Sequence, residues 1–119
     1  MRAILLVDHG SRVEAANAQL GEVARLVERV AGDGTRVRHA HMELATPSIP
    51  EGIDALVREG ATEIVVVPYF LAPGRHATSD VPRIAFDAAA HHRGVSERVA
   101  APLGVHDLLA QLVLVRARE

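Results

Sequence analysis

The chain has 119 residues, with 13 Lys and Arg against 15 Asp and Glu, seven His and no Cys. This length suits a single domain with one hydrophobic core. The formal net charge of −2 argues against a general nucleic-acid binder, which needs clustered positive charge. The lack of cysteine excludes disulfides, thiolate zinc sites, Cys-ligated iron–sulfur clusters and thiol nucleophiles, so any metal must be held by nitrogen and oxygen.

Membrane and export signals are absent from the sequence pattern. No segment reaches the roughly 18 continuous apolar residues of a membrane helix. The N-terminal apolar run ends at Asp8 and His9, where a signal peptide would need small residues for cleavage. We therefore predict a cytoplasmic protein that makes no membrane contact.

The first third of the chain predicts a strand, a helix and a second strand. Residues 3–7 are continuously apolar, which is typical of a strand covered on both faces. Apolar residues at helical spacing predict a helix over 14–31, ended by Gly32. Residues 35–42 are a weaker strand candidate, because they are polar for a central position.

The middle of the chain repeats this alternation. Ser48 and Glu51 have the spacing of a capping box, in which each residue bonds the other's backbone N–H. They predict the start of a helix that ends at Gly60. Residues 64–67 repeat the buried-strand pattern, and Pro68 is expected to break it.

The last third predicts a helix, a short strand and a final helix. Ser79 or Asp80 is expected to cap a helix that runs to about residue 92, with Pro82 tolerated in its first turn. A strand is predicted over 99–101 and a helix over 106–116. We expect the final helix to bury one face, formed by Leu108, Leu109, Leu112 and Val113.

Four successive βα units predict an α/β fold with a parallel sheet and helices on both faces. At this size we expect one flavodoxin-like, three-layer domain over residues 1–119, with a four-stranded sheet in the order 2-1-3-4. Ligands of such sheets bind outside the carboxyl ends of the strands. The polar residues directly after each strand are therefore the candidates for chemistry.

Three side chains that follow the first three strands stand out: His9, Glu43 and His76. Because neighbouring parallel strands end at the same edge, two imidazoles and a carboxylate can converge there. That set suits divalent Fe, Co, Ni or Zn and leaves positions open for a substrate. From the residues alone, each also has a structural interpretation, as a strand-end residue, a residue that complements a helix dipole, or an exposed loop residue.

The remaining histidines offer one rival site. His39, His41 and Glu43 alternate along one strand face, so a local His-x-His-x-Glu metal site is an alternative. Helices normally cover the faces of a parallel strand, which argues against it. Two further groups are expected at the surface: the pair His91 and His92, which ends a helix, and His106, which lies at the ligand-binding edge.

Other active sites of this topology lack a required residue. A phospho-acceptor receiver domain needs an Asp where the third predicted strand ends, but Pro68 and Tyr69 stand there. A histidine phosphatase needs Arg before His9, and the chain has Asp8. No glycine-rich phosphate-binding motif follows the first strand.

The sequence resembles the small class II chelatases of the CbiX and SirB type. The resemblance runs in order through nearly the whole chain, and a lone His-Gly-Ser would mean little. Its segments are Val7-Asp8-His9-Gly10-Ser11-Arg12, His41-Met42-Glu43-Leu44-Ala45-Thr46-Pro47-Ser48-Ile49, Val66 to His76 (VVPYFLAPGRH), Asp80-Val81-Pro82 and Ala101-Pro102-Leu103-Gly104-Val105-His106.

The resemblance implies an enzyme that inserts a divalent metal into sirohydrochlorin, giving sirohaem with iron or a corrin precursor with cobalt. The family's metal-handling His, Glu and His match His9, Glu43 and His76, which are then also the catalytic residues. Asp8 before His9 resembles the plant ferrochelatases, whereas cobalt-type relatives more often have Gly there, and this favours Fe²⁺. The plant enzymes carry a cysteine-bound iron–sulfur cluster, which a cysteine-free chain is not expected to hold.

The resemblance also implies a homodimer, as in the short forms of the family, and no permanently bound cofactor. Sirohydrochlorin bears eight carboxylates, so Ser11, Arg12 and Arg75, beside the proposed ligands, are predicted to bind it. One lobe offers a flat macrocycle only a shallow seat, and a second subunit would supply the other wall, with Tyr69 and Leu71 as contacts. The alternatives are a cobalt or nickel chelatase and a carrier that binds metal or tetrapyrrole without turnover.

Overall fold

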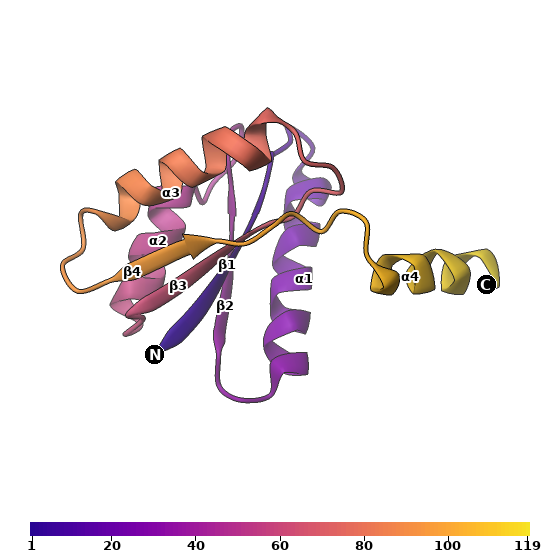
Figure 1. Ribbon diagram of the computed structural model, residues 1–119, viewed down its shortest axis with the longest axis horizontal. Coiled ribbons are helices and arrows are strands. Elements are labelled where there is room, and N and C mark those ends of the chain that lie inside the picture. Colours follow the sequence, from indigo (N-terminus) through magenta and orange to yellow (C-terminus); the bar gives the residue numbers. More distant parts are fainter.

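The computed structural model describes the backbone of residues 1–119 and the side chains of residues 1–75 and 78–119. Its sheet has four parallel strands in the order β2-β1-β3-β4, which confirms the predicted α/β fold and strand order (Figure 1). The elements along the chain are β1 (Arg2–Asp8), α1 (Glu14–Ala31), β2 (Arg36–His41), α2 (Ile49–Arg58), β3 (Glu63–Pro68), η1 (His76–Asp80), α3 (Val81–Ala89), β4 (Ser96–Val99) and α4 (Asp107–Ala117).

The core lies on both faces of the central strand β1. Leu5 and Val7 point to the side of α2 and α3, where they join the larger buried cluster. Leu6 points to the other side and packs with Leu20 of α1. Helices on both faces explain why this strand is continuously apolar, and they fix its carboxyl end between two layers (Figure 1).

Helix α2 begins with the predicted capping box. The hydroxyl of Ser48 accepts from the Glu51 backbone N–H, and the Glu51 carboxylate accepts from the Ser48 N–H. The helix buries Ile53 and Leu56 completely against the sheet. This cap places the start of α2 directly after the loop that carries Glu43.

Two predicted boundaries in the second half of the chain are wrong. Strand β4 spans Ser96–Val99 rather than 99–101, because its pairing with β3 runs from Glu63↔Ser96 to Val66↔Val99. An edge strand pairs on one side only, so it does not need the apolar run that marks a central strand. Asp80 does not cap α3 with its side chain, because η1 leads directly into the helix and Asp80 itself has helical torsions.

Helix α4 forms close to the predicted range, but the prediction that it buries one face is wrong. None of its residues is buried, and in Figure 1 it projects away from the sheet at the end of an extended segment. Apolar side chains point to several sides of this helix, with Leu108, Val113 and Val115 each more than half exposed. Among the elements described, no helix has the length and apolar character required to cross a membrane.

Candidate functional site

The site lies at the carboxyl ends of β1 and β2, which pair in register from Ala3↔Arg36 to Asp8↔His41. The pairing continues past both strands, because the Met42 N–H donates to the Asp8 carbonyl at 2.9 Å and the Glu43 N–H donates to the His9 carbonyl at 3.0 Å. Backbone hydrogen bonds therefore hold the two post-strand loops side by side. The predicted convergence of residues after the first two strands follows from this register.

His9 and Glu43 are in direct contact. His9 Nε2 lies 2.6 Å from Glu43 Oε1, a short hydrogen bond in which the imidazole N–H donates to the carboxylate. The two side chains are 42% and 54% exposed, so solvent and a substrate reach both. An accessible imidazole and carboxylate at this separation can share a proton or a divalent cation.

Gly10 allows the two loops to come this close. Its φ of +97° lies in the left-handed region that favours glycine. A Cβ built at this position would lie 1.7 Å from the Glu43 carbonyl oxygen and 3.3 Å from the Cβ of His41. Only a residue without a side chain fits between His9 and the loop that carries Glu43.

The rival metal site on β2 is not formed. His41 is 1% exposed, and its Nδ1 lies 2.6 Å from Asp8 Oδ1, across the strand pair. His39 packs against Gly21 of α1, where burial and then the neighbouring His41 lower its pKa below the usual range. Glu43 lies beyond the end of β2 and contacts His9 instead.

A buried asparagine fixes the loop after β1, and sequence reasoning did not single it out. The Asn17 amide oxygen accepts from the Ser11 N–H at 2.9 Å, and its NH₂ donates to the Ser11 carbonyl at 2.7 Å. The Ser11 hydroxyl accepts from the Val13 N–H. Its position in the sequence could have identified it, because Asn17 lies three residues before the buried Leu20 and so shares the apolar face of α1. A polar side chain on such a face needs hydrogen-bond partners.

The predicted cationic residues lie near this edge. Arg12 lines a polar hollow of about 340 Å³ beside the His9 loop, together with Ser11, Asn17, Leu44 and Thr46. Arg75 is exposed in the segment after β3. His76, the third predicted ligand, lies outside the residues whose side chains are described. Within the described part, no three His, Asp or Glu side chains gather closely enough to hold a metal ion.

The other histidines divide between pairing and exposure. His92 is not solvated as predicted, because its Nε2 lies 2.6 Å from Asp54 Oδ1 of α2. That contact ties the loop after α3 to the neighbouring helix. His91 is exposed, and His106 caps α4 by accepting from the Leu108 N–H at 3.0 Å.

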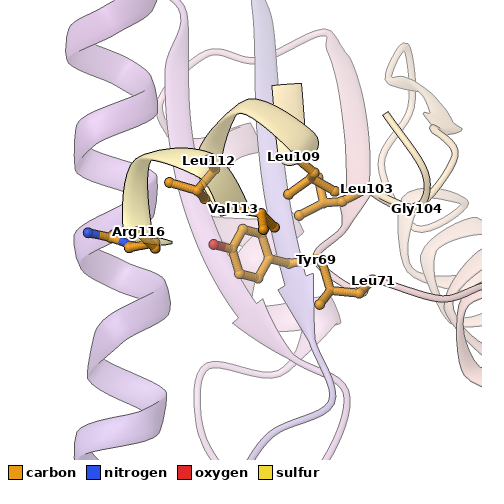
Figure 2. A pocket seen from close by; sticks show the side chains of 8 residues that line it. All are labelled: Tyr69, Leu71, Leu103, Gly104, Leu109, Leu112, Val113 and Arg116. Atoms are coloured by element: carbon orange, nitrogen blue, oxygen red, sulfur yellow. The ribbon is translucent and has the colours of Figure 1, made fainter. Parts of the chain in front are cut away.

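An apolar cavity of about 610 Å³ lies on the same side of the molecule, between the segments after β3 and β4 and helix α4. Figure 2 shows the Tyr69 ring and Leu71 on one wall and Leu112 and Val113 of α4 on the other, with the Arg116 side chain at one end. The remaining lining residues are Leu103, Gly104 and Leu109.

The comparisons with known proteins identify the family of this chain. The sequence profile of the CbiX family matches residues 3–119. The chain belongs to the CbiX family. A plant relative, the chloroplastic sirohydrochlorin ferrochelatase of Arabidopsis thaliana, is 44% identical over 92% of this chain and 48% of its own length. A sirohydrochlorin cobaltochelatase of Methanosarcina barkeri is 34% identical over 98% of this chain and 94% of its own length.

Solved structures show the same fold. A CbiX protein of cobalamin biosynthesis from Marinobacter aquaeolei has a TM-score of 0.77 at 32% identity, covering 99% of this chain and 95% of that one. The sirohydrochlorin chelatase SirB of Bacillus subtilis subspecies spizizenii, solved in complex with cobalt, has a TM-score of 0.80 at 34% identity over 98% of this chain and 50% of that one. The chain therefore spans about half the length of several relatives and nearly all of others.

Proposed function

We propose that this protein is a sirohydrochlorin chelatase, which inserts a divalent metal ion into the macrocycle without ATP. The observation that carries the proposal is the 2.6 Å contact between His9 Nε2 and Glu43 Oε1 at the carboxyl edge of the sheet. Family membership supports the substrate, since the relatives compared above are named as chelatases of sirohydrochlorin. These relatives include both an iron and a cobalt chelatase, so their names alone do not identify the metal ion that this protein inserts.

The proposed reaction leaves the net charge of the macrocycle unchanged. One dication enters the macrocycle and two pyrrole N–H protons leave, so the site must accept protons as the metal–nitrogen bonds form. The Glu43 carboxylate attracts the dication, and the imidazole of His9 holds it or takes a proton at different stages. The hydrogen bond between them gives the first proton a path from imidazole to carboxylate and then to solvent, because both side chains are exposed.

His76 is proposed as the third metal-handling residue. The order of the strands supports this, because β3 is the other neighbour of β1 and the segment that follows β3 begins at the same edge. Two imidazoles and one carboxylate would leave positions open for the four pyrrole nitrogens that finally receive the ion. We propose the same catalytic and metal-handling role for the set His9, Glu43 and His76.

Ser11, Arg12 and Arg75 are proposed to bind the carboxylates of sirohydrochlorin. Arg12 lines the polar hollow beside His9, and its guanidinium fork suits a carboxylate better than an ammonium group would. The Ser11 hydroxyl, which accepts from the Val13 N–H, still has its O–H to donate to a carboxylate, but it carries no charge, whereas each arginine does. We therefore assign the larger share of carboxylate binding to the two arginines.

Iron is the proposed physiological metal. The identity with the plant ferrochelatase is 44%, against 32–39% with six archaeal cobaltochelatases. Nitrogen and oxygen ligands accept Fe²⁺, Co²⁺ and Ni²⁺ alike, so sequence similarity rather than ligand chemistry supports this choice. A comparison of turnover with the three ions tests it, and a clear preference for Co²⁺ or Ni²⁺ would replace iron.

We also propose that the protein acts as a homodimer in which α4 lies at the interface. A helix that is apolar on several sides is normally buried, and full burial of one such side chain contributes about 1.5–3 kcal/mol. Val115→Glu on α4, at an exposed position outside the lining of the apolar cavity, should shift the protein to monomer in sedimentation velocity. Val30→Glu on α1 is the matched control, since Val30 is also largely exposed, and it should leave the dimer intact.

Absorbance spectroscopy distinguishes the chelatase from a non-catalytic carrier. Sirohydrochlorin mixed with the protein and Fe²⁺ or Co²⁺ should lose its free-base spectrum faster than without protein, and a carrier would bind the pigment without this acceleration. His9→Ala and His76→Ala should each abolish turnover and leave the far-UV circular dichroism spectrum unchanged. Full activity in either variant would contradict the proposed site.

A further inference from the structure

Below the His9–Glu43 contact, the structure contains a second imidazole–carboxylate pair that the proposed reaction does not use. Asp8 and His41 are partners across the β1–β2 register, and their side chains meet at 2.6 Å between Oδ1 and Nδ1. The side chain of His41 is 1% exposed and that of Asp8 is 23% exposed. Burial removes this imidazole from solvent and from direct contact with a macrocycle.

The pair belongs to three consecutive cross-strand links. The Asp8–His41 side chains form the first link, the Met42 N–H to Asp8 carbonyl bond the second, and the Glu43 N–H to His9 carbonyl bond the third. Each link is one residue further toward the edge of the sheet. The site residue His9 follows Asp8 directly, and Glu43 follows His41 by two residues.

Register explains why a polar pair would be placed there. A slip of one residue in a strand pair moves every side chain to the opposite face. An apolar pair at this level would specify the register less strictly, because hydrophobic contacts are not directional. A buried imidazole and a half-buried carboxylate do not tolerate it, since each would then lose its hydrogen-bond partner.

We propose that Asp8 and His41 are positioning residues for the metal-handling pair His9 and Glu43. Their hydrogen bond fixes the register of the two loops, and so sets the separation of His9 Nε2 and Glu43 Oε1. This inference rests on the proposed chelatase function for its role in turnover. Its effect on metal binding is a separate property of the same two side chains.

The test compares Asp8→Ala, which removes the acceptor, with Asp8→Asn, whose amide oxygen still accepts from His41 Nδ1. Asp8→Ala should lower kcat by about tenfold or more and raise KM for Co²⁺, because misplacement of reacting groups by a fraction of an ångström is costly. KM for sirohydrochlorin should not change, since neither residue faces the macrocycle. Asp8→Asn should stay within about threefold of the parent, because the hydrogen bond persists.

A matched control exists in the same chain. Asp54 and His92 make a pair of the same 2.6 Å separation, on α2 and the loop after α3. Asp54→Ala removes an imidazole–carboxylate hydrogen bond of the same length at a more exposed position, and it should leave all kinetic constants at the parent values. A general loss of stability would instead affect both variants through the folded fraction, which thermal melts measure.

Co²⁺ titration followed by calorimetry separates the two proposals. If the parent protein binds Co²⁺ but does not metallate sirohydrochlorin, the chelatase function fails, and weaker Co²⁺ binding by Asp8→Ala still supports the positioning role. A folded Asp8→Ala protein with parental Co²⁺ affinity and kcat overturns the inference. So does an Asp8→Asn protein that loses as much Co²⁺ affinity and kcat as Asp8→Ala. If Asp8→Ala does not fold, Asp8→Ser takes its place in the test. If neither variant folds, the Asp8–His41 pair is a determinant of folding alone, and the inference is overturned.

Discussion

Gly10→Ala is the substitution for which the structure gives the sharpest expectation. An alanine Cβ would lie 1.7 Å from the Glu43 carbonyl oxygen, whereas real Cβ contacts are essentially never shorter than 3.0 Å. The loop that carries Glu43 must therefore move by more than about 1 Å, and a misplacement of that size can reduce turnover about 100-fold. The hydrogen bond from the Glu43 N–H to the His9 carbonyl would be strained by the same movement.

A second cost of Gly10→Ala comes from the backbone. At φ +97°, an L-residue is strained by about 1–2 kcal/mol. Gly34→Ala separates this cost from the clash, because Gly34 also has a positive φ, of +86°, but a Cβ there would meet nothing within 4 Å. The control should lose only the stability that corresponds to backbone strain, about 3–10 °C in Tm.

The assay is metallation of sirohydrochlorin followed by absorbance, with thermal melts of each variant by circular dichroism. We expect Gly10→Ala to lose both activity and stability and Gly34→Ala to lose stability alone. Parental kcat in a folded Gly10→Ala protein would refute the argument that the two loops must touch. Equal loss of activity in both variants would show that positive φ, and not the contact with Glu43, is what matters.

Three further predictions concern stability. Ser48→Ala removes the capping box with Glu51 and should cost about 1 kcal/mol in urea unfolding, and an unchanged midpoint would contradict the role of the cap. Burial, and after it the neighbouring His41, lowers the pKa of His39 in the folded protein. As the pH falls below about 6.5, the unfolded chain therefore binds a proton at His39 more readily than the folded chain does. Stability should therefore fall through that range, and His39→Leu should flatten the fall in melts taken from pH 7.5 to 5. Burial raises the pKa of Glu97, whose buried Oε2 has no hydrogen-bond partner among the described side chains, so this carboxylate destabilises the fold at neutral pH and less so in acid. Glu97→Gln should raise Tm at pH 7 by more than at pH 5, and a lower Tm at pH 7 would contradict this sign.

Much of the site's location follows from pattern alone. Continuous apolar runs identify the strands β1 and β3, and the order of a parallel sheet places their carboxyl ends together. Once the strands are assigned, His9 and Glu43 must lie near the same edge, because each follows its strand by one or two residues. The length of the predicted strands could vary by two residues without changing that conclusion.

The contacts below the edge could not be predicted in the same way. The Asp8–His41 pair depends on the register of β1 against β2, and a shift of one residue would have paired Asp8 with Ala40 or Met42 instead. The spacing of apolar residues in the sequence also does not predict which element packs against a helix. Leu108, Leu109, Leu112 and Val113 have helical spacing, yet α4 carries apolar residues on several sides and none of them is buried.

The exposure of the site and the exposure of α4 have a common consequence for the proposed reaction. Metal insertion needs a partly dehydrated ion, and electrostatic attraction to Glu43 weakens as water enters between them. Half of each side chain in the His9–Glu43 pair is open to solvent in one chain. The apolar cavity lies between Tyr69 and α4 of one chain, and a macrocycle seated against it would be shielded from water on that side alone. A second subunit over this edge would exclude water from the other side. In the proposed dimer, association should therefore raise kcat as well as stability, and the Val115→Glu monomer should keep its Co²⁺ affinity while losing turnover.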